Sequence, residues 1–357
     1  MTERGRQDGT GGGWSVWGHA AGVDTLRRAL RTGRAAHAYL LAGPDGVGKS
    51  LIARTFGQAL ACEDAARPDS ADPCGVCRAC RRIARGTHPD VQVWSLASQA
   101  AGEKATGKNT TLTIETVRQL RGSTALRPLE APRRIAVVDD AEALQEPAQE
   151  ALLKTLEEPP PAMTIILLAN DAEALLPTIR SRCQVLELRP VAAGAIAAGL
   201  EASGIDPGIA REAAALANGR PGWAIRAAAD PSLLAEHRQS VARAIDWIAA
   251  PVSERVLTAA RLGDAFGKKR SDVFSELDAL QGVWRDAMLV AAGVSRYATH
   301  RPDLERIESV AAGSDVAEIV RALAAVQRCL ADLEANVRPR LALEGMVLEW
   351  PRPGAAR

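Results

Sequence analysis

The sequence predicts a parallel α/β sheet domain followed by smaller helical domains. Between Trp14 and about Pro190, short apolar runs alternate with amphipathic stretches, a pattern typical of a parallel sheet with helices on both faces. After Pro190 the strand signals disappear, and the chain is rich in alanine with glycine and proline as helix breakers. At 357 residues, the chain is long enough for two or three domains.

Five short apolar runs are the predicted buried strands. They cover residues 38–42, 91–96, 134–139, 164–169 and 185–188. Residues 102–111, between the second and third runs, are rich in Gly, Lys, Thr and Asn and predict a surface loop or hairpin.

Changes in composition along the chain predict the domain boundaries. We expect a flexible tail at residues 1–13, the sheet domain at 14–190, a small helical domain at 191–235, a second helical domain at 236–350 and a tail at 351–357.

A set of apolar residues in the last helical region recurs at spacings of three and four, which places the set on one helix face. Its members are Val316, Ile319, Val320, Leu323, Val326, Leu330 and Leu333. The more frequent explanation for such a stripe is packing inside a helical bundle. An exposed recognition helix is the alternative.

Composition excludes several classes of protein. The formal net charge of +1 excludes a broadly basic nucleic-acid binder. No uninterrupted apolar run approaches the roughly 20 residues that span a bilayer. The polar, glycine-rich start lacks the apolar segment of a secretory signal. We therefore expect a cytoplasmic protein without membrane contact.

Residues 43–50 read Gly-Pro-Asp-Gly-Val-Gly-Lys-Ser and fit the P-loop pattern G-x-x-x-x-G-K-[ST]. The motif lies between a predicted strand and an amphipathic helix, a context that disfavours a chance match. Glycines let backbone N–H groups surround phosphate oxygens, and the helix directs its positive end there. Lys49 is expected to reach the β and γ phosphates and Ser50 to ligate magnesium. The predicted nucleotide-binding residues are Gly43, Asp45, Gly46, Val47, Gly48, Lys49, Ser50, Leu51 and Asp139.

Two aspartates end the predicted strand at residues 134–139. A nucleotide hydrolase needs an acidic residue at the end of a neighbouring strand. Asp139 is the expected magnesium-side carboxylate, together with Ser50, and Asp140 is the candidate base. The alternative is that both aspartates only cap the next helix. Asp140 is also one methylene shorter than glutamate, which would hold a water farther from the γ-phosphate.

Four of the six cysteines follow the spacing C-x11-C-x2-C-x2-C. Cys62, Cys74, Cys77 and Cys80 are expected to close a tetrahedral zinc site, since four thiolates at this spacing stabilise a loop with little core of its own. The zinc would be structural, because no ligand position is left for water. Free thiols are the alternative. The other two cysteines, Cys183 and Cys329, are expected to be buried as small apolar residues.

The segment Ala151-Leu-Leu-Lys-Thr-Leu-Glu-Glu-Pro-Pro160, followed by Ser181-Arg182-Cys183, closely resembles the AAA+ clamp-loader family of bacterial DNA polymerase III. The motifs His37-Ala-Tyr-Leu, His88-Pro-Asp90 and Thr113-Ile-Glu-Thr-Val-Arg-Gln-Leu120 fall in the same order as in that family. The resemblance is detailed from Trp14 to about Pro190.

The resemblance implies a ring-like hetero-pentamer with gamma/tau and delta subunits, which contacts the sliding clamp transiently and primer-template DNA through the complex. It also implies ATP or ADP with Mg²⁺, a structural Zn²⁺, a lid domain at 191–235 and an oligomerisation collar at 236–350. Polymerase activity would belong to other subunits.

Two roles follow from the resemblance for single residues. Arg182 would be an arginine finger that reaches the adjacent subunit's nucleotide, since a guanidinium can neutralise charge on a γ-phosphate. The alternative is an ordinary surface arginine. Asn170, which ends the predicted strand at 164–169, occupies the sensor position, where it either orients the lytic water or caps the next turn.

Within the family, three details resemble the delta-prime branch more than the gamma/tau motor. These are Asp139-Asp140 followed by Ala141-Glu142-Ala-Leu144, Gly222 in place of a phosphate-sensing arginine, and an end soon after the third domain. We therefore expect nucleotide binding with weak or absent hydrolysis by the chain itself. The alternatives are a gamma/tau-type motor and a remodelling ATPase such as a Holliday-junction helicase. DNA contact at Arg118, Arg121 and Arg127 is a further hypothesis, and a solvated helix face is the commoner explanation.

Overall fold

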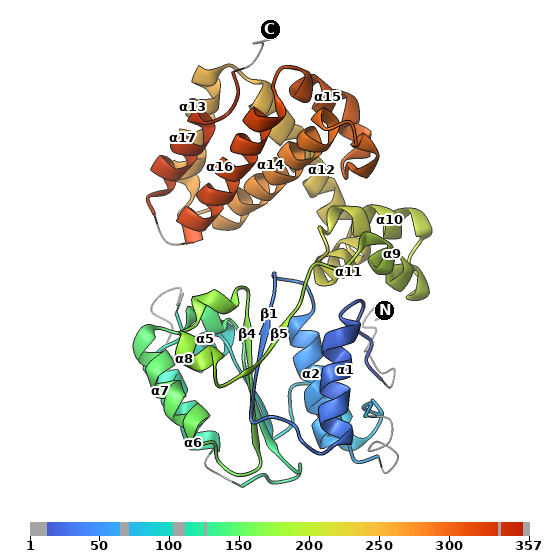
Figure 1. The fold of residues 1–357 in the computed structure, drawn as a ribbon, viewed down its shortest axis with the longest axis vertical. Helices are drawn as coiled ribbons and strands as arrows, with labels where there is room; N and C mark the ends of the chain where they lie inside the picture. The colour runs from blue at the N-terminus through green and yellow to red at the C-terminus, as the bar shows by residue number, and fades with distance from the viewer. Residues whose placement is uncertain (1–12, 65–70, 103–110, 125–126, 335–336, 353–357) are drawn as a thin grey trace, which may run out of the picture. The chain divides into compact units, whose positions relative to one another are not determined.

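The computed structural model describes residues 13–64, 71–102, 111–124, 127–334 and 337–352. Two compact units make up the chain, Met1–Ile225 and Arg226–Arg357 (Figure 1). The predicted tails and the predicted loop at 102–111 lie almost entirely outside the described residues. Within the described part, none of the helices combines the length and apolar character that a membrane span requires.

The first unit contains a five-stranded sheet in the order β2-β3-β4-β1-β5, and every pair of neighbours is parallel. The strands are β1 (Ala38–Ala42), β2 (Val91–Trp94), β3 (Arg134–Val138), β4 (Met163–Ala169) and β5 (Gln184–Glu187). The predicted parallel sheet is confirmed. The three central strands are fully buried, as expected for strands covered on both faces.

Two strand predictions were too long, the one at 134–139 by one residue and the one at 91–96 by two. The run predicted at 91–96 ends at Trp94, because helix α5 (Leu96–Gly102) begins there. Ser95 and Ser98 exchange hydrogen bonds: each backbone N–H donates to the other hydroxyl oxygen, at 2.8 and 3.1 Å. This reciprocal cap satisfies N–H groups at the start of the helix and ends the strand.

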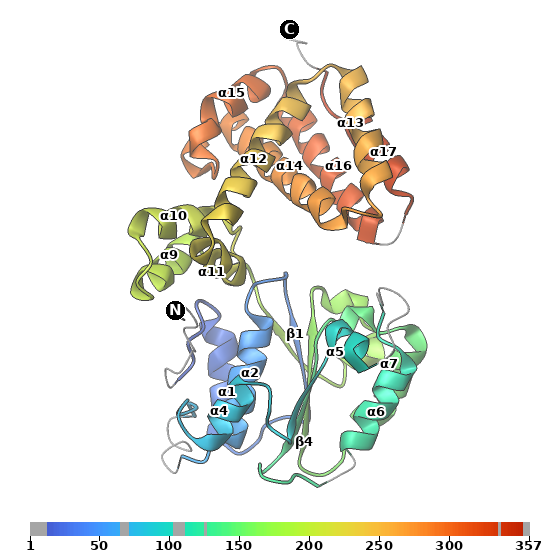
Figure 2. The same ribbon diagram turned by 180° about the vertical axis from the view of Figure 1, so that it is seen from behind.

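Helices cover both faces of the sheet (Figures 1 and 2). One layer contains α1 (Ala20–Arg31), α2 (Lys49–Ala61) and α4 (Arg78–Ala84), and the other contains α5, α6 (Ile114–Thr124), α7 (Glu146–Glu157) and α8 (Pro177–Arg180). Successive side chains of β1 alternate between the two layers. Tyr39 and Leu41 join the core under α2, and Leu40 joins the core under α7.

Only helices follow β5 in the described residues. The first unit continues with α9 (Ala193–Ala202), α10 (Pro207–Leu216) and the start of α11 (Pro221–Ala229). The second unit is a helical bundle around Trp284, which is 1% exposed. It comprises α12 (Pro231–Ala249), α13 (Val252–Ala265), α14 (Arg270–Ala291), α15 (Leu304–Ala312), α16 (Val316–Glu334) and α17 (Pro339–Leu348). The helical C-terminal region is therefore confirmed.

The predicted apolar stripe lies on α16. Ile319, Val326 and Leu333 are buried in the bundle core, which confirms the packing interpretation for these positions. Val316 and Val320 are 42% and 44% exposed, so the stripe is wider than the face that the bundle covers.

Candidate nucleotide-binding site

The strand order brings three predicted segments to one edge of the sheet. β4 lies between β1 and β3, and all three strands are parallel, so their carboxyl ends meet. The P-loop follows β1, Asp139 follows β3 and Asn170 follows β4. Ligands of open α/β sheets bind beyond the carboxyl ends of the strands, which makes this edge the expected site.

Two P-loop glycines have backbone angles that favour glycine. Gly46 and Gly48 have φ angles of 73° and 119°, in the left-handed region. Gly48 directly precedes α2, whose first N–H groups lack intrahelical acceptors and therefore suit an anion. Gly43 is needed for a different reason, since a Cβ atom there would lie 2.2 Å from the Leu188 carbonyl oxygen.

Lys49 is held inside the site. Its Nζ donates to the Gly43 carbonyl at 2.6 Å, the Pro44 carbonyl at 3.3 Å and the Asn170 Oδ1 at 2.7 Å. The side chain is 8% exposed. Burial lowers the pKa of Lys49, and nearby carboxylates, of which Asp45 has the largest effect, oppose that shift. The structure thus joins the P-loop lysine to the predicted sensor residue.

Ser50 and Asp139 lie together as predicted for a shared magnesium. The Ser50 Oγ donates to the Asp139 Oδ2 at 3.4 Å. The other Asp139 oxygen, Oδ1, accepts the Asp140 backbone N–H at 3.1 Å. A hydroxyl and a carboxylate at this separation are oxygen ligands of the kind that Mg²⁺ takes beside phosphates.

Asp140 precedes the short turn η1 (Ala141–Ala143) in a left-handed conformation, with φ 56°. Its side chain makes no capping hydrogen bond within this described turn, so the capping alternative is not observed for Asp140. Burial and the neighbouring Asp139 raise the pKa of Asp140. A carboxyl with a raised pKa at this edge can accept a proton near neutral pH more readily than an ordinary aspartate.

Glu142 is a member of the site that sequence reasoning missed as a functional residue. Burial raises its pKa, while its own N–H, the N–H of Asn170 and the charge of Lys49 favour the ionised form. Its Oε2 is buried and has no hydrogen-bond partner among the described residues. In the sequence, Glu142 is recognisable only as an acidic residue two positions after Asp140. Whether its side chain reaches the site depends on the conformation of η1, which the sequence does not reveal.

The start of α11 touches the P-loop. The Gly222 backbone N–H donates to the Gly46 carbonyl at 2.8 Å. A Cβ atom at position 222 would lie 3.1 Å from that same oxygen. The glycine that stands where an arginine was expected in a motor is therefore in direct backbone contact with the phosphate loop. Two residues earlier, the Arg220 Nε donates to the Ala217 carbonyl at 3.0 Å.

The contacts of Arg182 are with Thr178 and Glu157, and neither belongs to the P-loop. Arg182 lies after α8, and its Nη1 donates to the Thr178 carbonyl at 2.9 Å. Its Nη2 lies 2.8 Å from the Glu157 Oε1, and the side chain is 36% exposed. Of the basic residues named for DNA contact, Arg118 lies on α6 and pairs with Glu115 one turn earlier at 3.5 Å, which is typical of a solvated helix face.

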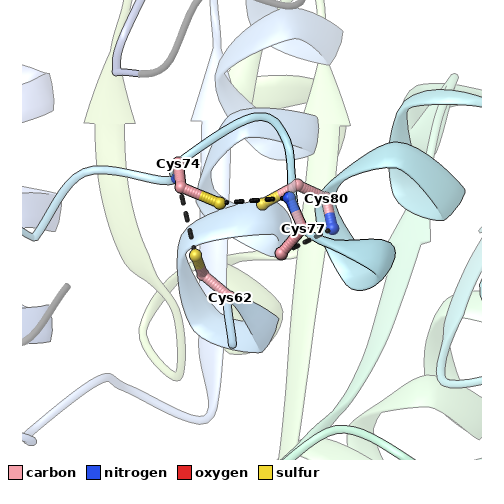
Figure 3. A group of neighbouring side chains, drawn as sticks. All are labelled: Cys62, Cys74, Cys77 and Cys80. Atoms are coloured by element: carbon pink, nitrogen blue, oxygen red, sulfur yellow. Dashed lines mark hydrogen bonds between the residues drawn. The ribbon is translucent and has the colours of Figure 1, made fainter. Parts of the chain in front are cut away.

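The four predicted zinc ligands converge beside α4 (Figure 3). Their Sγ atoms all lie within 4.8 Å of one another. Tetrahedral zinc with zinc–sulfur bonds of about 2.3 Å requires sulfur atoms about 3.8 Å apart, so the donor set fits this metal. Successive N–H groups point at the sulfurs: Cys74 donates to Cys62 at 3.5 Å, Cys77 to Cys74 at 3.3 Å and Cys80 to Cys77 at 3.4 Å.

The local environment shifts the pKa values of these cysteine thiols in different directions. Burial raises the pKa of Cys80, whereas backbone N–H groups and neighbouring thiols outweigh burial at Cys74 and lower its pKa to about 7. Of the two isolated cysteines, Cys329 is buried as predicted, whereas Cys183 is only partly buried against the core under α7. Burial raises the pKa of both Cys183 and Cys329 to about 12.

Comparisons with known proteins find similarity to subunits of DNA polymerase III. Residues 18–192 match the family described as "DNA polymerase III, delta subunit". The delta' subunit of DNA polymerase III from Pseudomonas aeruginosa is 38% identical over 148 residues, which is 42% of each chain. The gamma/tau subunit from Mycobacterium bovis is 35% identical over 157 residues, 44% of this chain and 25% of the relative. The chain thus spans less than half the length of these curated relatives.

A solved gamma-subunit-related protein of DNA polymerase III from Thermotoga maritima aligns over 94% of this chain and 99% of its own. Its identity of 16% and TM-score of 0.38 are too low to support a functional conclusion.

The strand order, the P-loop motif and the acidic end of β3 together give the architecture of a P-loop α/β domain. The part of the chain at residues 18–192 is therefore similar to clamp-loader subunits of DNA polymerase III.

Proposed function

We propose that this chain is a nucleotide-binding subunit of a clamp loader, of the delta-prime kind, and that it donates Arg182 to the nucleotide of a neighbouring gamma/tau-type subunit. The observation that carries nucleotide binding is the convergence of the P-loop, Lys49, Asp139 and Asn170 at one sheet edge. The family match supports the clamp-loader role. Loading of a sliding clamp onto primed DNA, together with a delta subunit, is part of this proposal.

In this function, phosphate oxygens accept hydrogen bonds from the backbone N–H groups around Gly46 and Gly48. When nucleotide binds, the Lys49 ammonium gives up its hydrogen bonds to the Gly43 and Pro44 carbonyls and donates to phosphate oxygens instead. Ser50 and Asp139 hold a magnesium ion, which neutralises phosphate charge. Helices α9 to α11 serve as a lid, since Gly222 already contacts Gly46. Four thiolates hold a structural zinc ion beside α4. The second unit acts as the oligomerisation collar.

The delta-prime assignment is supported by two residues at the site. Asp140 is shorter than the glutamate expected of a motor, and Gly222 lacks a side chain that could sense phosphate. The position of Arg182 fits a role in trans, because it contacts Glu157 and Thr178 and its side chain is 36% exposed. These features suit a subunit that binds nucleotide, turns it over weakly and completes its neighbour's site.

A second candidate is a gamma/tau-type motor. It is favoured by the complete P-loop, the raised pKa of Asp140 and the 35% identity to gamma/tau relatives. The two candidates differ in whether the chain hydrolyses ATP alone.

The test compares ATP binding and turnover by the purified chain, alone and assembled with gamma/tau and delta subunits. Lys49→Ala and Arg182→Ala are the variants, and Arg211→Ala, at an exposed arginine of α10, is the control. A delta-prime role predicts little turnover alone, large loss in the assembled complex with Arg182→Ala, and little loss with Lys49→Ala. Turnover by the chain alone that Lys49→Ala removes would assign it to the motor branch.

A further inference from the structure

An ion pair joins the two sequence segments that resemble the clamp-loader family, residues 151–160 and 181–183. Glu157 is the last residue of α7, and Arg182 follows α8. Arg182 Nη2 lies 2.8 Å from the Glu157 Oε1. We propose that Glu157 is a positioning residue that orients the Arg182 guanidinium for the neighbouring subunit's nucleotide. This inference rests on the trans role of Arg182 proposed above.

The geometry fixes the guanidinium and still leaves it able to bind an anion. Glu157 holds Nη2 and the Thr178 carbonyl accepts from Nη1 at 2.9 Å. A planar group held at two different nitrogens cannot rotate freely about its last bonds. Guanidinium carries five N–H donors, so these two contacts leave donors for phosphate oxygens. The two side chains are 36% and 48% exposed, which keeps the pair accessible.

The pair is better suited to positioning than to stabilising the fold. Exposed ion pairs contribute little to stability, because water screens them and two long side chains lose freedom. A free arginine side chain populates many rotamers and loses that conformational entropy when it binds a transition state. An arginine that an ion pair already holds in one rotamer does not lose this entropy during the reaction. Removal of Glu157 should therefore leave the chain folded while it makes the finger less effective.

The next residue provides a matched control. Glu158 is also a glutamate and also exposed, but it makes no ion pair within the described part of the chain. It lies just beyond the end of α7, with φ −124° and ψ 70°, so its side chain leaves the backbone differently. Glu157→Gln and Glu158→Gln remove the same charge from adjacent positions, and only the first removes the partner of Arg182.

The experiment measures ATP turnover by the chain assembled with gamma/tau and delta subunits. Because a misplacement of about 1 Å can cost up to about 100-fold, we expect Glu157→Gln to lower kcat about 3- to 30-fold. KM for ATP should not change, since the finger acts in the transition state. Glu158→Gln should stay within about twofold of the wild type. Glu157→Gln added to Arg182→Ala should cause no further loss, because both act through one group.

The outcomes separate this inference from the proposed function. If Arg182→Ala cripples the complex but Glu157→Gln behaves like Glu158→Gln, the finger stands and the positioning role is wrong. If Glu157→Gln raises kcat, Glu157 competes with the nucleotide for Arg182, and positioning is again wrong. If Arg182→Ala has no effect, the proposed trans role itself fails.

A second measurement needs only the isolated full chain. The Nε–Hε group of Arg182, assigned with Arg182→Lys, should show a high NMR order parameter in the wild type and in Glu158→Gln. Glu157→Gln should lower that order parameter, while the melting temperature stays unchanged. Equal mobility of Arg182 in the wild type and in Glu157→Gln would overturn the proposal, whatever the complex does.

Discussion

Removal of metal from the four-cysteine site should unfold α4 locally and leave the sheet intact. The apolar core under this site consists of Ala61, Ala79 and Ile83, with partly buried neighbours. Burial of the isoleucine contributes about 2–3 kcal/mol and each alanine less than about 1 kcal/mol. Structural zinc sites of this type bind with about 10–16 kcal/mol of apparent free energy. A zinc ion at this site would therefore contribute at least twice as much as the local core.

The assay combines metal analysis with hydrogen exchange. The purified chain should contain stoichiometric zinc, and Cys74→Ser or chelation should abolish protection of α4, residues Arg78–Ala84. Protection of β4 should persist, because its cores on both faces are built from other residues. Cys183→Ser, which removes an isolated thiol, is the control and should retain the metal. Persistent protection of α4 in metal-free protein would refute the reasoning.

Three further outcomes are expected. Gly43→Ala should destabilise the first unit by about 1–3 kcal/mol in chemical denaturation, since its Cβ would lie 2.2 Å from the Leu188 carbonyl oxygen; full stability would contradict this. Gly222→Arg should weaken nucleotide binding, measured by calorimetry, because its Cβ would lie 3.1 Å from the Gly46 carbonyl oxygen; tighter binding of ATP would show that a phosphate sensor had been restored. Burial opposes ionisation of Asp286, but the His300 side chain and the N–H groups of His300 and Thr299 hold its pKa below the usual range. A lowered folded-state pKa gives stability that is present above about pH 4 and lost as pH falls through the folded pKa. Asp286→Asn should therefore lower the melting temperature at neutral pH and flatten its decline in acid, and an unchanged profile would exclude this role.

The P-loop and the acidic strand end could be predicted because their signals are local. A strand, a glycine-rich turn and a helix start follow each other in residues 38–50, and the motif fixes the backbone that it needs. Parallel order then places the ends of β1, β3 and β4 at one edge without further information. The cysteine cluster could be predicted for the same reason, since spacing alone limits how far its members can separate.

Contacts that depend on tertiary packing could not be predicted. The pairing of Glu157 with Arg182 requires α7 to end where the chain leaves α8, and neither residue type carries that information. In the second unit, Asp286 is fully buried and accepts from the His300 Nδ1 at 2.8 Å. That contact depends on Gly282, where a Cβ atom would lie 2.7 Å from the His300 ring. A lone buried acid has no sequence motif, so only packing reveals it.

The charges around Lys49 explain why the site needs a divalent cation to act as proposed. Asp45, Glu142, Asp139 and Asp140 all act electrostatically on Lys49, and one ammonium cannot balance four carboxyl groups and the several negative charges of a triphosphate. A magnesium ion at Ser50 and Asp139 would supply the missing positive charge beside these carboxylates. We infer that Mg²⁺–nucleotide orders the P-loop and, through the Gly46–Gly222 hydrogen bond, the start of α11. A subunit with such a site can become rigid on binding nucleotide even if it hydrolyses that nucleotide slowly. Rigidity of the subunit that donates Arg182 would help to hold the guanidinium in place at its neighbour's nucleotide.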